Sequence, residues 1–189
     1  MRKYSPTLVL LADNLGTAFQ SISALSSGSL SGGSAWLGAI FYSLQLYFDF
    51  SGYSDMAIGM AKLFGFDFEA NFDHPYLSGS LMEFWRRWHI SLGRWFRDYV
   101  YIPLGGSRVS TAKCIRNLLI VWILTGLWHG ASWTFAAWGL YHGILLLLEK
   151  YPLKGVLEKT PSPIRHILTL LAVIIGWVLF FSPDFSSAL

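Results

Sequence analysis

The sequence carries little charge. Only 13% of its 189 residues are charged, against about 25% in a typical soluble domain, whereas 53% are hydrophobic and 17% are aromatic. So little charge cannot cover a water-facing surface, which excludes an intrinsically disordered chain, a coiled coil and a nucleic-acid-binding domain. The composition predicts an integral membrane protein in contact with the lipid bilayer, and the net charge of +3 is typical of basic cytoplasmic loops.

Cysteine is almost absent. Cys114 stands alone, which excludes an intramolecular disulfide framework and a multi-cysteine metal site. The five histidines are not grouped at the spacing of metal ligands, so we expect no metal site. We also expect no bound cofactor. The phosphate-loop, zinc-protease and serine-hydrolase motifs (GxxxxGKS/T, HExxH and GxSxG) are also missing.

Apolar segments alternate with polar ones and predict an all-α integral membrane protein, a multi-helix transmembrane bundle with broken, re-entrant and interfacial helices. The clearest transmembrane helix is 164–182, and 117–148 is long enough for two helices that meet near Gly130. The other expected segments are an interfacial or partly buried helix at 6–25, a flexible Ser/Gly linker at 26–34, two helical pieces within 35–66, a loop at 67–80 and a polar loop at 149–163.

A polar joint interrupts the segment 35–66, where Gly52 predicts a helix break between Asp49 and Asp55. A carboxylate at the centre of a lipid-facing helix costs roughly 2.5–3.5 kcal/mol. The two aspartates are six residues apart, so they do not share a face of a regular helix. We interpret them as ion-pair anchors, with the arginines of 81–101 as partners, rather than as a catalytic dyad.

The segment 81–101 predicts a single basic amphipathic helix lying in the membrane interface. On a helical wheel its aromatic residues share one face, and the opposite face carries Arg86, Arg87, Arg94 and Arg97. Half of the fourteen Lys and Arg residues lie in 86–116. By the positive-inside rule, this stretch is expected to face the cytoplasm.

His129 lies between two apolar runs, with Gly126 and Gly130 on either side. Two interpretations are open: a core histidine that packs against a neighbouring helix, or a general base. A neutral imidazole can accept a proton from a hydroxyl at cytoplasmic pH, and the glycines would let a substrate or another helix approach the backbone. His89 is open in the same way, either as an interfacial histidine among aromatics or as a second polar group in the cavity of His129.

Three segments carry a family resemblance: LQLYFDFSGYSDMAIG, NFDHPYLSGSLMEFWRRWHISLGRWFRDYVYIPLGG and LTGLWHGASWTFAAWGLYHG. They resemble the membrane-bound O-acyltransferase superfamily, and within it the bacterial branch of alginate O-acetyltransferases and teichoic acid D-alanyl transfer proteins, the former more closely. The likeness spans about 35–150. Members of this family are more than twice as long, so we expect 1–189 to be one partial membrane domain, the C-terminal half, without the family's N-terminal helices.

The resemblance implies a function and two site residues. His129, in the WHG motif, would be the catalytic histidine, and His89, in WRRWHISL, the second histidine in a tunnel through the helix bundle. It further implies a multi-pass protein of the inner (plasma) membrane. An acyl thioester, acetyl-CoA or an acyl carrier protein, would donate acetyl groups from the cytoplasm toward an extracytoplasmic polysaccharide such as alginate, with periplasmic acetyltransferase subunits as partners.

Two alternatives to acetyl transfer stay open. One is D-alanyl or other acyl transfer in the modification of a cell-wall polymer. The other is a non-catalytic, transporter-like membrane subunit, because polar residues on broken helices also fit a transporter. A transporter would depend on Asp49 and Asp55 as much as on His129.

Overall fold

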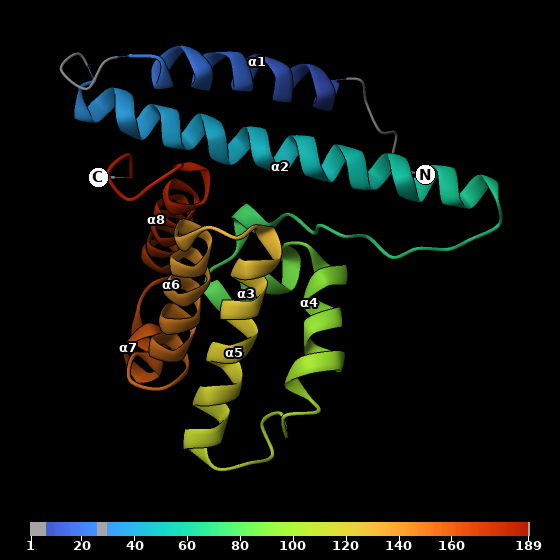
Figure 1. The fold of residues 1–189 in the computed structure, drawn as a ribbon, viewed down its shortest axis with the longest axis vertical. Helices are drawn as coiled ribbons and strands as arrows, with labels where there is room; N and C mark the ends of the chain where they lie inside the picture. The colour runs from blue at the N-terminus through green and yellow to red at the C-terminus, as the bar shows by residue number, and fades with distance from the viewer. Residues whose placement is uncertain (1–6, 26–29, 189) are drawn as a thin grey trace. The chain divides into compact units, whose positions relative to one another are not determined.

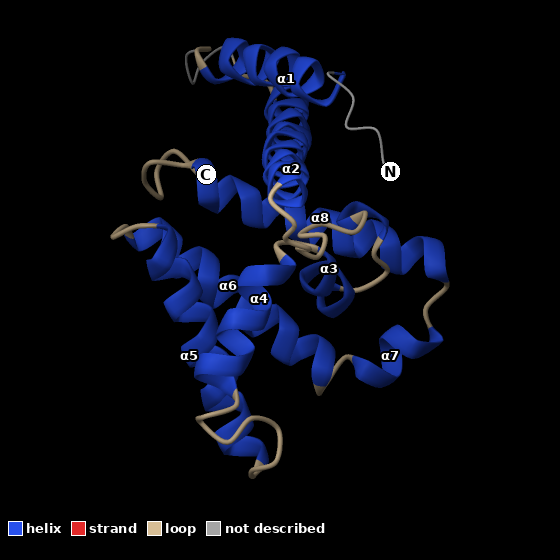
Figure 2. Cartoon of the chain, turned by 90° about the vertical axis from the view of Figure 1, so that its right-hand side faces the viewer, coloured by secondary structure: helices blue, strands red, loops and turns tan. Residues whose placement is uncertain are grey.

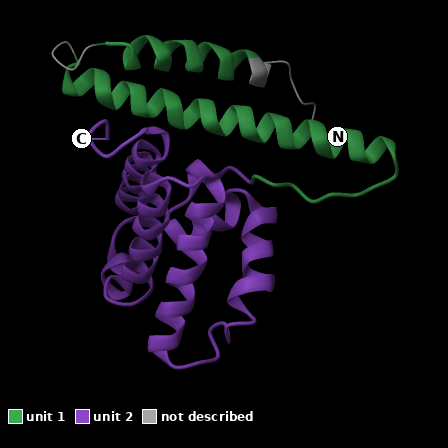
Figure 3. Cartoon of the chain, viewed as in Figure 1, with its two compact units in different colours: residues 1–72 green, residues 73–189 purple. Residues whose placement is uncertain are grey.

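The computed structural model describes residues 7–25 and 30–188, and within these ranges it contains helices and no strand (Figures 1 and 2). The chain divides into two compact units, residues 1–72 and 73–189 (Figure 3). The all-helical architecture predicted from the alternation of apolar and polar segments is therefore confirmed.

The first unit consists of two helices, α1 (Thr7–Ser23) and α2 (Gly32–Leu63), which lie side by side (Figure 1). The rings of Phe19 and Tyr42 join them, with centroids 5.1 Å apart. The predicted helix at 6–25 is thus confirmed. The predicted linker extended too far. Its residues 26–29 lie outside the described part of the chain, and α2 already begins at Gly32.

Helix α2 runs unbroken through Gly52, so the predicted break there is wrong. A glycine in a helix interior costs only about 1 kcal/mol relative to alanine, and the helical residues on both sides outweigh that cost. Asp49 is exposed and Asp55 half-buried, on different faces of this regular helix. Their pairing with arginines of 81–101 stays a prediction.

The second unit contains the remaining helices, and most of them are short. After a 3₁₀ turn at Pro75–Leu77 come α3 (Leu81–Arg87), α4 (Ile90–Phe96), a π-helical turn at Arg97–Tyr101, α5 (Thr111–His129), α6 (Trp133–Lys150), α7 (Lys154–Lys159) and α8 (Ser162–Phe181). The loop predicted at 149–163 is correct except that α7 forms within it.

The single amphipathic helix predicted at 81–101 is wrong, because the chain breaks at His89 between α3 and α4. The backbone of His89 is left-handed, with φ 45° and ψ 55°. This residue turns the chain, so one helical wheel does not apply to both sides of it. The aromatic face divides accordingly: Phe84 and Trp88 are buried, whereas Trp95 is 51% exposed.

Two helices of the second unit, α5 and α8, are long and apolar enough to cross a membrane. The two-helix interpretation of 117–148 is confirmed, since α5 ends at His129 and α6 begins at Trp133. Helices α5 and α6 pack closely because Gly126 and Gly139 lack a Cβ. A Cβ at Gly126 would meet the carbonyl of Phe135, and one at Gly139 would meet the carbonyl of Trp122.

The core of this unit is a tryptophan cluster with one ring from each of four helices, Trp85 of α3, Trp122 of α5, Trp138 of α6 and Trp177 of α8. The ring centroids of Trp85 and Trp122 are 4.7 Å apart, and those of Trp138 and Trp177 are 6.0 Å apart. Each tryptophan has about 150–250 Å² to bury. This apolar surface holds α3, a helix of only seven residues, against the long helices.

Candidate active site

The end of α5 is fixed by Gly130, which follows His129. Gly130 has φ 158° and ψ 159°, and a Cβ there would stand 2.8 Å from a ring carbon of Phe135. Residues with a Cβ rarely adopt this conformation, and a Cβ here would require the Phe135 ring to shift. The helix must therefore end at His129, and the chain turns directly into α6.

The ring of His129 lies among aromatic rings from three helices. Its centroid is 4.9 Å from that of Trp128, 5.2 Å from that of Trp138 and 4.9 Å from that of Phe180 on α8. The residue is half-buried. Within residues 7–25 and 30–188, no hydrogen bond or ion pair engages its ring nitrogens, so a lone pair is available to a ligand.

His89 approaches the same place from the junction of α3 and α4. Its ring packs edge-on against Trp128, with centroids 6.2 Å apart, so Trp128 contacts both histidines. The Oγ of Ser91 lies 3.5 Å from His89 Nδ1. Burial lowers the pKa of His89 to about 4, which keeps the ring neutral near pH 7.

The left-handed backbone of His89 costs free energy, and hydrogen bonds fix α3 on its N-terminal side. A non-glycine residue in this region costs on the order of 1–2 kcal/mol, and such residues are frequent at functional sites. The N–H of Asp73 donates to the carbonyl of Arg87 over 2.9 Å. The Glu149 carboxylate accepts from the N–H groups of Leu81 and Met82, which anchors the start of α3.

Sequence reasoning missed His142. It is fully buried inside the tryptophan cluster, 4.8 Å from Trp85 and 5.2 Å from Trp138 between ring centroids. Neither of its ring nitrogens has a hydrogen-bond partner in the protein. Its position four residues after Trp138, on the same face of α6, was the available signal. The contact of His142 with Gly176 of α8 has no signal in the sequence.

The other two histidines are engaged elsewhere. His74 contacts Asp73 over 3.2 Å at an exposed site, and His166 Nδ1 lies 3.0 Å from the carbonyl oxygen of Ser78. In the part of the chain that the structure describes, no three His, Cys, Asp or Glu side chains are grouped to hold a metal ion. His129 and His89 are therefore the pair that the structure brings together at an accessible position.

Comparison with known proteins agrees with this arrangement of motifs. The family model described as membrane-bound O-acyltransferase matches residues 9–186. The chain belongs to this family. The resemblance inferred from the three sequence segments is thereby confirmed, and with it the membrane character of the protein.

Named relatives share much of the sequence. The chain is 51% identical over 172 residues to the "Probable alginate O-acetylase" of Azotobacter vinelandii, covering 91% of this chain and 34% of the relative. It is 41% identical over 184 residues to the "Peptidoglycan O-acetyltransferase" of Helicobacter pylori, covering 96% and 35%. With the "Teichoic acid D-alanyltransferase" of Streptococcus thermophilus it shares 37% over 119 residues, covering 57% and 28%. The chain thus spans about a third of the length of these relatives.

Proposed function

We propose that this chain is part of a membrane O-acetyltransferase that transfers acetyl groups to a polysaccharide. The observation that carries the proposal is the half-buried ring of His129, whose nitrogens have no partner in the described protein, next to the neutral His89. Family membership and the relatives named as acetylases of alginate and peptidoglycan support the same reaction and acceptor class.

In the proposed reaction His129 is the general base. An unprotonated ring nitrogen of His129 accepts the proton of an acceptor hydroxyl, and the hydroxyl oxygen forms a bond to the carbonyl carbon of the acyl thioester. The tetrahedral oxyanion collapses, and the carbon–sulfur bond breaks. The proton on His129 passes to the leaving thiolate, so the products are an O-acetyl ester and a free thiol.

His89 is proposed as a positioning residue in this reaction. Its ring and that of His129 pack on the same indole of Trp128, and its lowered pKa leaves it uncharged when the acceptor binds. A neutral imidazole can donate one hydrogen bond and accept another. It can therefore orient the hydroxyl without adding positive charge beside the base.

The proposal extends to the setting of the reaction. We place the enzyme in the inner membrane as a multi-pass protein, with one domain over 1–189 that forms part of the tunnel wall. Acetyl-CoA or an acyl carrier protein would supply the thioester on the cytoplasmic side, where the basic stretch 86–116 lies. The acceptor, such as alginate, and the periplasmic partner subunits would lie on the other side.

D-alanyl transfer is the second candidate, because relatives named as teichoic acid D-alanyltransferases also match the chain. The identity to these relatives is lower and covers less of the chain. Both reactions esterify a hydroxyl from a thioester, so the same histidines would serve either one. The acyl group distinguishes them.

The test is the ester content of extracellular polysaccharide from cells that make the protein. Mild alkali should release acetate from polysaccharide of producing cells, and the His129→Gln variant should reduce this acetate to the level of cells without the protein. Release of D-alanine instead would favour the second candidate. Unchanged ester content would refute both, and losses on Asp49→Asn and Asp55→Asn as large as the loss on His129→Gln would favour a transporter.

A further inference from the structure

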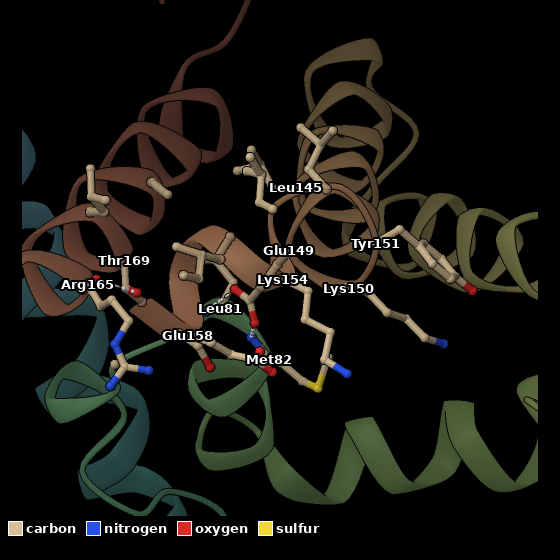
Figure 4. A pocket seen from close by; sticks show the side chains of 17 residues that line it. Leu81, Met82, Leu145, Glu149, Lys150, Tyr151, Lys154, Glu158, Arg165 and Thr169 are labelled. Atoms are coloured by element: carbon tan, nitrogen blue, oxygen red, sulfur yellow. Dashed lines mark hydrogen bonds between the residues drawn. The ribbon is translucent and has the colours of Figure 1, made fainter. Parts of the chain in front are cut away.

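A cavity of about 700 Å³ lies among α3, α6, α7 and α8 (Figure 4). It lies away from His129, because α6 begins beside His129 at Trp133 and runs 12 residues, about 18 Å, to Leu145, its first residue in the cavity wall. Its wall is mostly aliphatic. The main contributors are Leu81, Leu145, Leu148, Leu157 and Leu168.

The charged residues at this cavity are predominantly basic. Lys150, Lys154 and Arg165 line it together with Glu149 and Glu158. Glu149 is already engaged, since its carboxylate accepts hydrogen bonds of 2.8 and 3.1 Å from two backbone N–H groups of α3. The five charged side chains carry a net charge of +1. With Glu149 held by α3, Glu158 is the carboxylate left beside the basic groups, of which Lys150 also lies over the ring of Tyr151, and this balance favours a ligand with negative charge.

The guanidinium of Arg165 has a buried N–H group without a partner. Its Nε is buried and has no hydrogen-bond partner in the protein, and no ion pair joins its guanidinium to a described acidic residue. A buried donor without a partner is costly. The side chain lines both this cavity and a neighbouring one of about 510 Å³. A guanidinium in this state is suited to phosphate, which accepts its N–H groups in pairs.

The cavity also lies where a membrane surface would be. It opens at the C-terminal end of α6 and the N-terminal end of α8, a helix long and apolar enough to cross a membrane. Tyr151 and Lys150 line the cavity at this end, and aromatic and basic residues of this kind are enriched at membrane interfaces. Basic pockets between transmembrane helices bind acidic lipid headgroups.

We propose that this cavity binds an anionic phospholipid. An acyl chain lies along the leucine wall, and the phosphate lies against Arg165 and the two lysines. The apolar wall distinguishes this ligand from a free phosphate ion, and the basic excess distinguishes it from a zwitterionic lipid. The site is independent of the proposed acyl transfer, because it contains neither histidine.

The experiment uses the purified protein in nanodiscs of phosphatidylcholine with increasing phosphatidylglycerol, and retained lipid is counted by native mass spectrometry. The wild type should retain phosphatidylglycerol in preference to phosphatidylcholine. Each of Arg165→Gln and Lys154→Gln should weaken this retention about fivefold, and the double variant about 25-fold. Lys159→Gln is the matched control, since it removes the same charge from α7 outside the cavity and should change nothing.

Several outcomes would overturn the proposal. Equal retention of the two lipids would show that the headgroup is not recognised. An equal effect of Lys159→Gln would show that lipid retention depends on the overall surface charge and not on the cavity. Displacement of the lipid by millimolar inorganic phosphate would assign the site to a small anion. If Arg165→Gln fails to fold, Lys154→Gln and the charge-retaining Arg165→Lys decide. About fivefold weaker retention is expected for the first and a smaller loss for the second, since lysine keeps the charge without the paired N–H groups.

Discussion

Two histidines of the second unit, His129 and His142, share a neighbour and differ in access. Both ring centroids lie 5.2 Å from that of Trp138. The nitrogens of His142 are buried without a hydrogen-bond partner, and no hydrogen bond engages those of His129 within residues 7–25 and 30–188. His129 ends a helix and is half-exposed, whereas His142 is 0% exposed in the middle of α6. An unpartnered imidazole therefore does not by itself mark a catalytic base. Access to the ring is what distinguishes the two histidines.

The largest expected effect is on catalysis by His129. His129→Gln should lower acetyl transfer by about 10²–10⁴-fold without changing membrane insertion, because an amide hydrogen-bonds but does not take the proton. Ester content per inserted protein measures this. His89→Gln should retain part of the activity, since an amide can still position a hydroxyl.

A His129→Gln variant that inserts in the membrane and keeps near-normal activity would contradict this prediction. His129 would then be a packing residue, like His142. His129→Ala would then lower the abundance of the protein rather than its turnover. Equal losses in His129→Gln and His89→Gln would instead assign the proton transfer to the pair.

The long helices around these histidines could be predicted from the sequence, and the local breaks could not. The apolar runs that flank Gly130 were sufficient to place α5 and α6. The left-handed turn at His89 has no local signal, because a histidine in that conformation is held by tertiary contacts such as the bond from Asp73 to Arg87. At Gly52 the error was the opposite one: a break was predicted where the helix continues, since the low helix propensity of one glycine was too weak to end α2.

The candidate site shows the same limit, because local sequence patterns do not report tertiary contacts. The motifs indicate His129 and His89 as candidates, and the structure adds that Trp128 contacts both rings. The burial of His142 depends on Trp85 and Gly176, which lie 57 residues before and 34 residues after it in the chain. Periodicity along α6 shows which face His142 shares with Trp138 but not what covers that face.

The second prediction concerns the close packing that holds both histidines. Gly139→Ala would place a Cβ against the carbonyl of Trp122. Backbone must then shift, at a cost of about 1–3 kcal/mol, which lowers the thermal unfolding midpoint. Gly155→Ala in α7 is the matched control, since nothing lies within 4 Å of its Cβ, and it should be neutral or stabilising by up to about 1 kcal/mol. Equal midpoints would show that α5 and α6 are less closely packed than the structure has them.

The smallest effect is expected at His142. Leucine is close to histidine in volume and has no polar atom, so His142→Leu removes two buried nitrogens that have no partner in the protein. A buried polar group in that state costs about 1–3 kcal/mol, so the variant should keep or gain stability. Acetyl transfer should stay near the wild-type level, because the indole of Trp138 separates His142 from the accessible ring of His129.

His142→Gln completes the comparison, since it places an unpartnered amide in the same cluster and should destabilise the protein where leucine does not. Thermal midpoints and ester content, measured on both variants, separate packing from chemistry. The opposing outcome is that His142→Leu keeps the thermal midpoint of the wild type and loses as much acetyl transfer as is expected for His129→Gln. Burial would in that case no longer distinguish the two histidines. His142 would then act through Trp138 on the base, and the site would extend across the tryptophan cluster to α8.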